Sequence, residues 1–457
     1  MQNNKAITPI IATILLVVVA VILVTIILAF GKGFTNTSLD KTNSIKELSV
    51  SDAGVFVYPK SFGDGVLQVN YQPPSNIQEP VVIASYKVLE IPDMESITLS
   101  TPFTLTNNST NILSLDCLYE YSLESPEMTI QLITEDNTYI DIKQRDPEMV
   151  CTSTGDGSED NPKIICSAED LNAVRDNLDW NYTLGKDIDL QCFSRLDVNG
   201  WVPIGNDSVG FTGIFNGNKR KISNLYINRP TTDNIGLFGY ASSGSGIKNV
   251  GLEDVNISGH SRVGGLVGYN AAEIITNSNS TGFVSGYSYV GGLIGTNYGK
   301  NINYNYSEGV VYAEDSIVGG LIGAGGGNIQ NNYSFASVRS LNTDGGLIGM
   351  LVDDAGDTNI VNNYSIGIVW QEYDVFGGLI GSAQEDSIFY LENNFWDINT
   401  SEIDKGYNAQ NISEIDGKTT TEMKTQSTFT DWDFGSIWNI DSIKNEGYPY
   451  LINNPPR

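Results

Sequence analysis

The chain has 457 residues, which is too long for a single compact core, so we expect two or three domains. Glycine (47 residues), asparagine, serine and threonine are abundant, which favours strands and turns over helices and predicts a mostly β fold class. The formal net charge of −29 argues against nucleic-acid binding, because a surplus of carboxylates repels phosphates.

The N-terminal region contains an uncharged apolar run from Ile7 to Phe30. As a helix it would be about 36 Å long, enough to cross the hydrocarbon core of a bilayer. The run is longer than the apolar region of an ordinary secretory signal peptide, although Ala29-Phe30-Gly31 leaves a removed signal as an alternative. A helix that is apolar on every face must be surrounded by lipid or by other helices.

The segment from Lys5 to Thr13 resembles the N-terminus of archaeal type IV pilin-like precursors. The resemblance implies a short leader that prepilin peptidase removes between Ala6 and Ile7. Pro9 then falls in the first helical turn, where its missing N–H removes no helical hydrogen bond. Ile11 stands where bacterial pilins carry glutamate, so the resemblance is to the archaeal version. It implies self-association through the helix and contact with the pilus assembly machinery; a plain one-pass membrane anchor is the alternative.

The next segment carries seven short apolar or alternating runs between residues 55 and 142. Turn residues such as Gly63-Asp64-Gly65 separate them. Seven strands at this spacing predict a β-sandwich over residues 41–149. A sandwich head after the helix is also what a pilin-like protein would have, by analogy alone.

Four cysteines, Cys117, Cys151, Cys166 and Cys192, follow the apolar run. None of their spacings is Cys-x-x-Cys, which disfavours a zinc site. Outside the cell they would form disulfides, and four cysteines allow three pairings. We expect Cys117 to pair with Cys151 and Cys166 with Cys192, each bond closing a loop of about 30 residues.

A glycine-rich phrase recurs six times at steps of 26 to 32 residues. The copies are Ile235 to Gly239, Gly264 to Gly268, Gly291 to Gly295, Gly319 to Gly323, Gly345 to Gly349 and Gly377 to Gly381. Such a period indicates a repeat architecture, and the glycine density excludes helices. Three short strands in each coil of about 27 residues predict a right-handed parallel β-solenoid, or β-helix, over residues 150–399.

Stacked coils would place equivalent side chains above one another and complete a core that one coil cannot bury alone. We expect the glycine pairs where the wall turns tightly or where a side chain would clash with the next coil. A second phrase, Asn-Tyr-Ser, recurs at Asn305, Asn332 and Asn363, and its asparagines are expected to form hydrogen-bonded ladders.

The repeats closely resemble the GLUG-motif repeats of bacterial and archaeal surface proteins. The resemblance extends from Asp187 to Tyr450 and implies a structural or binding module at the cell surface. Because open strand edges invite aggregation, both ends need covers. Ser167, followed by a run to Leu178, predicts a capped helix at the first end. At the far end we expect a cap over residues 400–457.

Three aromatic residues, Trp432, Trp438 and Tyr448, are expected to anchor this far cap by burial, with a sugar-stacking surface as the alternative. The predicted division of the chain is a leader at 1–6, a pilin-like helix and linker at 7–40, the sandwich at 41–149, the solenoid at 150–399 and the cap at 400–457.

Catalytic motifs are lacking in the sequence: it has no Gly-x-Ser-x-Gly, no His-Glu-x-x-His, no P-loop and no Rossmann glycine pattern. The single histidine, His260, is expected in an exposed loop. We therefore predict that the protein is not an enzyme and uses no cofactor. Two acidic clusters are alternative candidates for a structural Ca²⁺ site or for the paired carboxylates of a glycan-active enzyme. They are Asp353, Asp354 and Asp357, and Glu385 with Asp386.

Twelve Asn-x-Ser/Thr sequons are candidate N-glycosylation sites if the chain is exported. Their asparagines are Asn36, Asn107, Asn108, Asn181, Asn206, Asn256, Asn279, Asn305, Asn332, Asn363, Asn399 and Asn411. The function these features indicate is a surface filament subunit or pilus-associated adhesin, in contact with the membrane and with surface glycans or other cells. A monomeric membrane-anchored adhesin and a glycan-active β-helix enzyme are the alternatives.

Overall fold

The computed structural model describes the chain over fifteen stretches between Ser49 and Pro456. They are 49–50, 56–63, 66–72, 81–90, 96–106, 110–114, 127–137, 139–145, 151–191, 193, 198–352, 358–370, 375–384, 389–407 and 415–456. Several predictions fall outside them: the leader with its cut between Ala6 and Ile7, the apolar helix, Cys117, Cys192, the acidic clusters at 353–357 and 385–386, and Asn36, Asn107, Asn108 and Asn411. None of the helices within these stretches is long and apolar enough to cross a bilayer.

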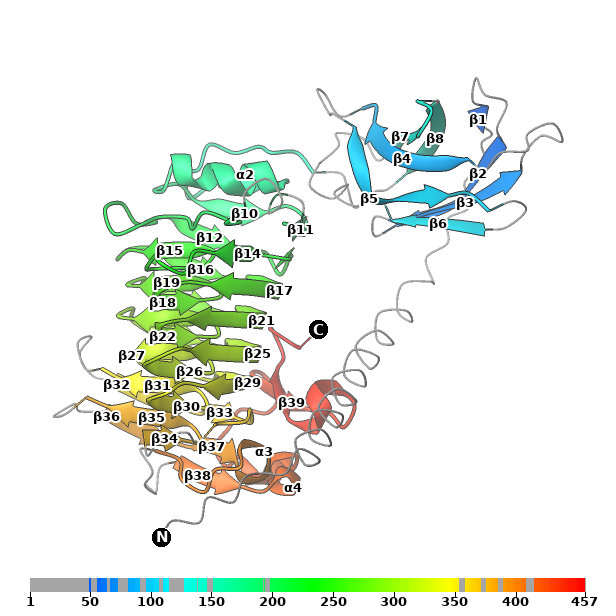
Figure 1. The fold of residues 1–457 in the computed structure, drawn as a ribbon. Helices are drawn as coiled ribbons and strands as arrows, with labels where there is room; N and C mark the ends of the chain where they lie inside the picture. The colour runs from blue at the N-terminus through cyan, green and yellow to red at the C-terminus, as the bar shows by residue number, and fades with distance from the viewer. Residues whose placement is uncertain are drawn as a thin grey trace, which may run out of the picture.

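The first part of the described chain forms two four-stranded antiparallel sheets (Figure 1). One sheet has the order β1 (Ser49–Val50), β2 (Phe56–Gly63), β3 (Val66–Gln72), β6 (Thr110–Ser114). The other has the order β5 (Ile97–Thr104), β4 (Val82–Val88), β7 (Glu127–Thr134), β8 (Tyr139–Arg145). Alternate residues of β3 and β7, such as Leu67, Val69, Ile130 and Leu132, lie in one buried cluster. Both sheets contribute to this single core, as the predicted β-sandwich requires.

The larger part of the chain is a parallel β-solenoid with four walls (Figure 1). Wall 1 contains β9 (Lys163–Ile165), β10 (Tyr182–Leu184), β12 (Ile214–Asn216), β16 (Gly246–Lys248), β20 (Ile274–Thr276), β24 (Asn301–Asn303), β28 (Asn328–Gln330), β32 (Thr358–Val361) and β36 (Phe389–Glu392). Wall 2 contains β11 (Ile188–Asp189), β13 (Lys221–Ser223), β14 (Tyr226–Asn228), β17 (Gly251–Ser258), β21 (Asn279–Gly286), β25 (Tyr306–Ala313), β29 (Tyr333–Arg339), β33 (Tyr364–Ser365), β37 (Asn394–Asp397) and β38 (Ile415–Lys418).

The other two walls are built from shorter strands. Wall 3 contains β18 (Ser261–Gly264), β22 (Ser288–Gly291), β26 (Ile317–Gly319), β30 (Thr343–Gly345) and β34 (Val375–Gly377). Wall 4 contains β15 (Phe238–Ala241), β19 (Val267–Asn270), β23 (Ile294–Asn297), β27 (Ile322–Gly325), β31 (Ile348–Leu351) and β35 (Ile380–Ala383). Each regular coil therefore contributes four strands, and the prediction of three is wrong.

The extra strand arises because the glycine-rich phrase spans a corner. In one coil, β26 ends at Gly319 and β27 begins at Ile322, so Gly320 and Leu321 form the corner itself. A Cβ atom on Gly320 would lie 2.1 Å from the carbonyl oxygen of Gly346 in the next coil. The glycine pair thus lies both at a tight turn and where a side chain would clash with the next coil, as predicted.

The leucine of each phrase points into the solenoid. These side chains are fully buried, and they are Leu237, Leu266, Leu293, Leu321, Leu347 and Leu379. The residue after each leucine is paired with its equivalent in the next coil, for example Ile294 with Ile322 and Ile322 with Ile348. Equivalent apolar residues therefore stack in one continuous core, which confirms the solenoid prediction.

Buried asparagines form a ladder at the corner between walls 1 and 2. The Nδ2 atom of Asn305 donates to Oδ1 of Asn332 at 3.1 Å. Asn332 donates in the same way to Asn363, and Asn363 to Asn394, each at 3.0 Å. Each Oδ1 also accepts a backbone N–H from the preceding coil, as in the 2.9 Å bond from Asn305 N to Asn332. The predicted asparagine ladder is therefore confirmed, and it satisfies polar groups that would be costly to bury unpaired.

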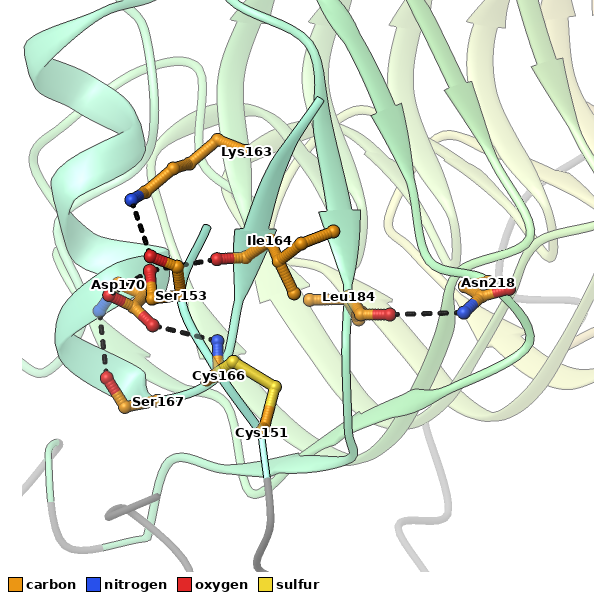
Figure 2. Close-up of a disulfide and its surroundings, with 9 residues drawn as sticks. All are labelled: Cys151, Ser153, Lys163, Ile164, Cys166, Ser167, Asp170, Leu184 and Asn218. Atoms are coloured by element: carbon orange, nitrogen blue, oxygen red, sulfur yellow. Dashed lines mark hydrogen bonds between the residues drawn. A yellow bond between two sulfur atoms is a disulfide. The ribbon is translucent and has the colours of Figure 1, made fainter. Parts of the chain in front are cut away.

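The first end of the solenoid is covered by a short helix, α2 (Ala168–Asn172), followed by the 3₁₀ helix η3 (Ala173–Asp176). The Ser167 hydroxyl accepts the backbone N–H of Asp170, so the predicted N-cap is confirmed. Asp170 lies between two other segments (Figure 2), where its carboxylate accepts Cys166 N at 2.8 Å and the Ser153 hydroxyl at 3.1 Å.

A disulfide joins Cys151 to Cys166 beside this helix (Figure 2). The pairing predicted from the sequence is therefore wrong, since it gave each of these cysteines a different partner. The chain from Cys151 turns back and runs beside β9, where Ile164 N donates to the carbonyl oxygen of Thr154 at 2.7 Å. This turn brings the two Cα atoms to 5.5 Å, a distance that suits a disulfide.

Replacing both Cys151 and Cys166 with alanine is expected to destabilise the first coil by about 3 kcal/mol, the chain-entropy value for a short closed loop. Urea unfolding of the full chain, with and without a reductant, measures this change. The difference in stability between wild type and the double variant should disappear in the reductant, because both then lack the Cys151–Cys166 bond.

Only part of the C-terminal segment lies at the end of the solenoid, where the far cap was predicted. Strand β38 extends wall 2 by pairing with β37. Residues 419–456 then fold back along the outside of wall 2, next to β29 and β33 (Figure 1), and Asn454 reaches Ser278, several coils earlier, with a 3.2 Å hydrogen bond. The segment contains α4 (Thr420–Met423), η5 (Gln426–Thr428), β39 (Trp438–Ile440), η6 (Lys444–Gly447) and β40 (Pro449–Leu451), and α3 (Ile398–Ser401) precedes β38. Residues 419–456 cover a side of the solenoid, whereas residues 401–407 and 415–418 lie over its last regular coil, where the Lys405 and Gly406 carbonyl oxygens accept backbone N–H groups of Gly378 and Ile380.

Candidate binding surface

The longest strands of the solenoid, in wall 2, are divided in the middle by a row of residues with little or no side chain. Gly282 on β21 and Gly309 on β25 are paired in register and have φ angles of +131° and +118°. A Cβ on Gly309 would lie 2.0 Å from the Gly282 carbonyl oxygen. Glycine is therefore required at this kink, which separates the outer surface of wall 2 into two halves.

The first half presents a ladder of stacked rings. Tyr306 and Tyr333 are 4.8 Å apart between ring centroids, and Tyr333 and Tyr364 are 5.2 Å apart, with nearly parallel planes in both pairs. The folded-back C-terminal segment covers this ladder with Trp432 and Trp438. Burial raises the pKa of the Tyr333 and Tyr364 hydroxyls well above the usual value for tyrosine.

The predicted anchors Trp432, Trp438 and Tyr448 are buried in this cluster, with at most 6% of any of them exposed. Trp438 also donates its ring N–H to Asn331 at 3.1 Å, and Tyr448 donates its hydroxyl to Asp397 at 2.8 Å. Their rings pack against the solenoid, so the alternative of a sugar-stacking surface is wrong for these three residues.

Glu308 lies beside this covered half of wall 2. The residue as a whole is exposed, but desolvation of its carboxyl group, and then the nearby Glu446 carboxylate, raise the pKa of Glu308 above its ordinary value. A raised pKa means that the folded state disfavours the charged form. The folded chain therefore loses stability as the pH rises from the ordinary glutamate pKa through the raised one.

Replacing Glu308 with glutamine should remove this loss and raise the melting temperature at pH 7, while leaving it nearly unchanged near pH 3. Thermal unfolding of the full chain at a series of pH values measures the difference between variant and wild type. Val310→Thr, which changes an exposed and uncharged residue of the same strand, is the control and should leave the difference flat across pH. A variant less stable than wild type at pH 7 would contradict the explanation.

The second half of wall 2 leaves large apolar side chains exposed. We define the aromatic stripe as Phe283, Val310, Tyr312, Ile368 and Trp370. Phe283 pairs with Val310, and the row continues to Ile368 through the bridge between Val338 and Val369. Phe283, Val310, Ile368 and Trp370 are between 40% and 52% exposed. In the intervening coil Ser337 and Arg339 occupy the matching positions, so the stripe has a polar gap. Such a group of exposed apolar side chains on an acidic protein is typical of an interaction surface.

Next to one end of the stripe, a shallow groove of about 340 Å³ lies where wall 2 turns into wall 3. Its lining residues are Pro230, Ser258, Gly259, His260, Phe283, Ser285, Gly286, Tyr287, Tyr312 and Glu314. His260 lies on the corner between β17 and β18, where its Nδ1 atom is 2.7 Å from an Asp233 oxygen. The His260 ring stacks on Tyr287 with centroids 5.3 Å apart. The lone histidine lies in an exposed bend, as expected, with a side chain 45% exposed, and its ring is held by Asp233 and Tyr287.

The structure corrects four of the candidate glycosylation sites. Asn305, Asn332 and Asn363 are fully buried in the asparagine ladder, and Asn279 is 2% exposed with its amide donating to Asn454. An attached glycan would have no room in the folded protein. Asn181 is half-buried and accepts Ile214 N at 2.9 Å, whereas three other sequon asparagines are exposed and stay candidates: Asn206, Asn256 and Asn399.

The described stretches of the chain contain no group of three or more His, Cys, Asp or Glu side chains close enough to hold a metal ion. Sequence reasoning missed the aromatic stripe and the groove. The available signal was the apolar residue that follows each kink glycine, as in Gly282-Phe283-Val284 and Gly309-Val310-Val311, where a second apolar side chain must point outward.

Comparisons with known proteins agree with this architecture. The family model described as the GLUG motif matches residues 259–285. Halomucin of Haloquadratum walsbyi is 35% identical over 136 residues, which are 28% of this chain and 1% of halomucin. A provisionally named Gly-rich membrane protein of Evansella cellulosilytica is 35% identical over 121 residues, 25% of this chain and 14% of that protein. The chain thus spans only a small part of the length of these relatives.

A solved structure from Bacteroides ovatus, provisionally named an immunoglobulin A1 protease, covers 66% of this chain and 95% of its own. The TM-score is 0.50 and the sequence identity is 20%, so this likeness shows the fold alone. Together these findings confirm GLUG-type repeats in the solenoid and a β-solenoid fold for the larger part of the chain.

Proposed function

We propose that this chain is a cell-surface structural protein that presents the aromatic stripe of its solenoid to a partner outside the cell. The observation that carries the proposal is the exposed row from Phe283 to Trp370 on a wall whose other half is covered by the chain's own C-terminal segment. The repeats build a long surface, and Glu314 is the one carboxylate among the described residues that line the groove. This arrangement supports binding rather than catalysis.

A location outside the cell is supported by two features of the chain. The Cys151–Cys166 disulfide is the kind of bond that persists in oxidising, extracellular surroundings. The apolar run from Ile7 to Phe30 is long enough to hold the chain in a membrane. The names of the relatives, a halomucin and a Gly-rich membrane protein, are consistent with a surface role.

We propose further that the N-terminal helix assembles the chain into a pilus-like filament after prepilin peptidase cuts between Ala6 and Ile7. In this arrangement the sandwich forms the filament surface and the solenoid projects from it as an adhesin. A monomeric membrane anchor with the same layout is the alternative. Electron microscopy of expressing cells, labelled against the solenoid, separates the two, because only the first predicts labelled filaments.

Surface location and adhesion are tested on intact cells that express the full chain. Brief protease treatment should cleave the chain without lysing the cells, and a chain that stays protected would end the proposal. The double variant Phe283→Ser, Trp370→Ser should adhere less than wild type at an equal amount on the surface. Tyr390→Ser, an exposed tyrosine on wall 1, is the matched control and should adhere as wild type does.

A further inference from the structure

The groove at the corner of walls 2 and 3 combines aromatic rings with hydrogen-bonding groups. The rings of Phe283, Tyr287 and Tyr312 line it together with the hydroxyls of Ser258 and Ser285. We infer that this groove is a binding site for a neutral saccharide, a short stretch of a sugar chain. The inference rests on the proposed surface function and names the chemistry of its ligand.

Sugar rings have apolar C–H faces and a rim of hydroxyl groups, so they require both kinds of side chain in one place. Aromatic rings pack against the C–H faces, and serine and glutamate oxygens accept hydrogen bonds at the rim. The Ser258 hydroxyl can donate one, whereas the Ser285 hydroxyl already donates to the Ile257 carbonyl oxygen at 3.1 Å. Tyr287 and Glu314 come from successive coils, which are joined here by the 2.8 Å hydrogen bond from Glu314 N to the Gly286 carbonyl oxygen. Its volume of about 340 Å³ lies at the lower end of the range of small-ligand sites, roughly 300 to 1,000 Å³.

One side of the groove is held in place before any ligand arrives. The Asp233 carboxylate accepts Ser261 N at 3.2 Å and lies 2.7 Å from His260 Nδ1. The His260 ring is in turn stacked on Tyr287 with an interplanar angle of 10°. Because Tyr287 is 44% exposed but supported on one face, binding would cost little side-chain entropy.

Charge excludes the anionic ligands. The chain carries −29 net charges, and among the described residues that line the groove there is a carboxylate, Glu314, but no lysine or arginine. Nucleic acids, acidic polysaccharides and anionic lipid head groups would be repelled. A neutral sugar has no such penalty and can donate hydroxyl protons to Glu314.

Backbone pairing disfavours an extended peptide as the ligand. The strands next to the groove, β17, β21 and β25, are paired with neighbours on both sides, so they offer no free edge for an added strand. The alternation of rings with Ser258 and Ser285 also interrupts the apolar surface that an amphipathic helix would need. The composition of the groove therefore suits a saccharide better than a protein.

Affinity electrophoresis of the full chain tests this inference, with soluble polymers cast into the gel. The neutral probes are a β-glucan, a mannan and a galactan, and polygalacturonate is the anionic probe. At least one neutral polymer should retard the wild type, and polygalacturonate should not. Tyr287→Ala should weaken the retardation at least tenfold in apparent Kd, and Tyr390→Ala, an exposed tyrosine on wall 1, should leave it unchanged.

His260→Ala provides a second variant, since it removes a lining ring together with the support of Tyr287 and should therefore also weaken binding. The inference is overturned if no neutral polymer retards the wild type, if Tyr287→Ala binds as wild type does, or if polygalacturonate is the polymer that binds. The inference is also overturned by two results together: protease treatment of the target cells abolishes adhesion, and polysaccharides from those cells do not bind the chain. Surface exposure with adhesion but without saccharide binding would reject this inference alone, whereas an intracellular chain would reject the proposed function.

Discussion

Replacing Gly320 with alanine is expected to lower the free energy of unfolding by about 3 kcal/mol or more, at the upper end of what overpacking costs. The new Cβ atom would lie 2.1 Å from the Gly346 carbonyl oxygen and 2.2 Å from the Ser334 hydroxyl. The hydroxyl can rotate away, but the carbonyl belongs to the backbone of the next coil. The corner can therefore accept a methyl group only if adjacent coils move apart, which weakens the contacts that stabilise a stacked repeat.

Urea unfolding of the full chain, followed by far-UV circular dichroism, measures this effect. Gly246→Ala is the matched control, because its added Cβ would meet only methyl groups of Ile214 and Ile274, at 3.0 and 3.2 Å. Such side-chain ends can shift, so the control should cost less than about 1 kcal/mol. Equal losses in the two variants would show that the close approach of successive coils is not what requires glycine at the corner.

The periodic part of the fold could be predicted because its determinants repeat in the sequence. Leu321 and Asn332 have equivalents in neighbouring coils, so the core row and the asparagine ladder follow from stacking alone. The number of walls could not be predicted in this way. The corner at Gly320 lies inside a short phrase that reads as one apolar stretch, and only the backbone direction divides it into two strands.

The features that the sequence did not predict depend on contacts between dissimilar segments. Trp438 donates to Asn331, 107 residues earlier, and nothing in the period of the repeats indicates which side of the solenoid the last segment covers. The Cys151–Cys166 disulfide depends on a local turn, and loop length alone favoured other partners. The groove likewise combines His260, Tyr287 and Glu314 from three successive coils, and the sequence analysis considered only His260, as an exposed loop residue.

Truncating Trp438 to alanine is expected to cost about 3 to 5 kcal/mol, the usual range for a buried tryptophan. Its side chain is fully buried, its ring lies within 6.1 Å of Tyr333 and Tyr364 between centroids, and it donates to Asn331. The aromatic cluster it belongs to is separate from the core inside the solenoid. The loss should therefore fall mainly on the C-terminal segment, which should detach while the coils stay folded.

Limited proteolysis of the full chain distinguishes local from global loss. Trp438→Ala should be cut quickly within residues 419–456 and leave a resistant core with native circular dichroism. Trp370→Ala is the matched control, because this tryptophan is 52% exposed on the aromatic stripe and should change stability by less than about 1 kcal/mol. Detachment would also uncover the ladder of Tyr306, Tyr333 and Tyr364, so the variant should aggregate at concentrations where wild type stays monodisperse. If Trp438→Ala instead unfolds the coils together with the segment, then the folded-back segment is part of one cooperative unit with the solenoid and is not a cover added to its side.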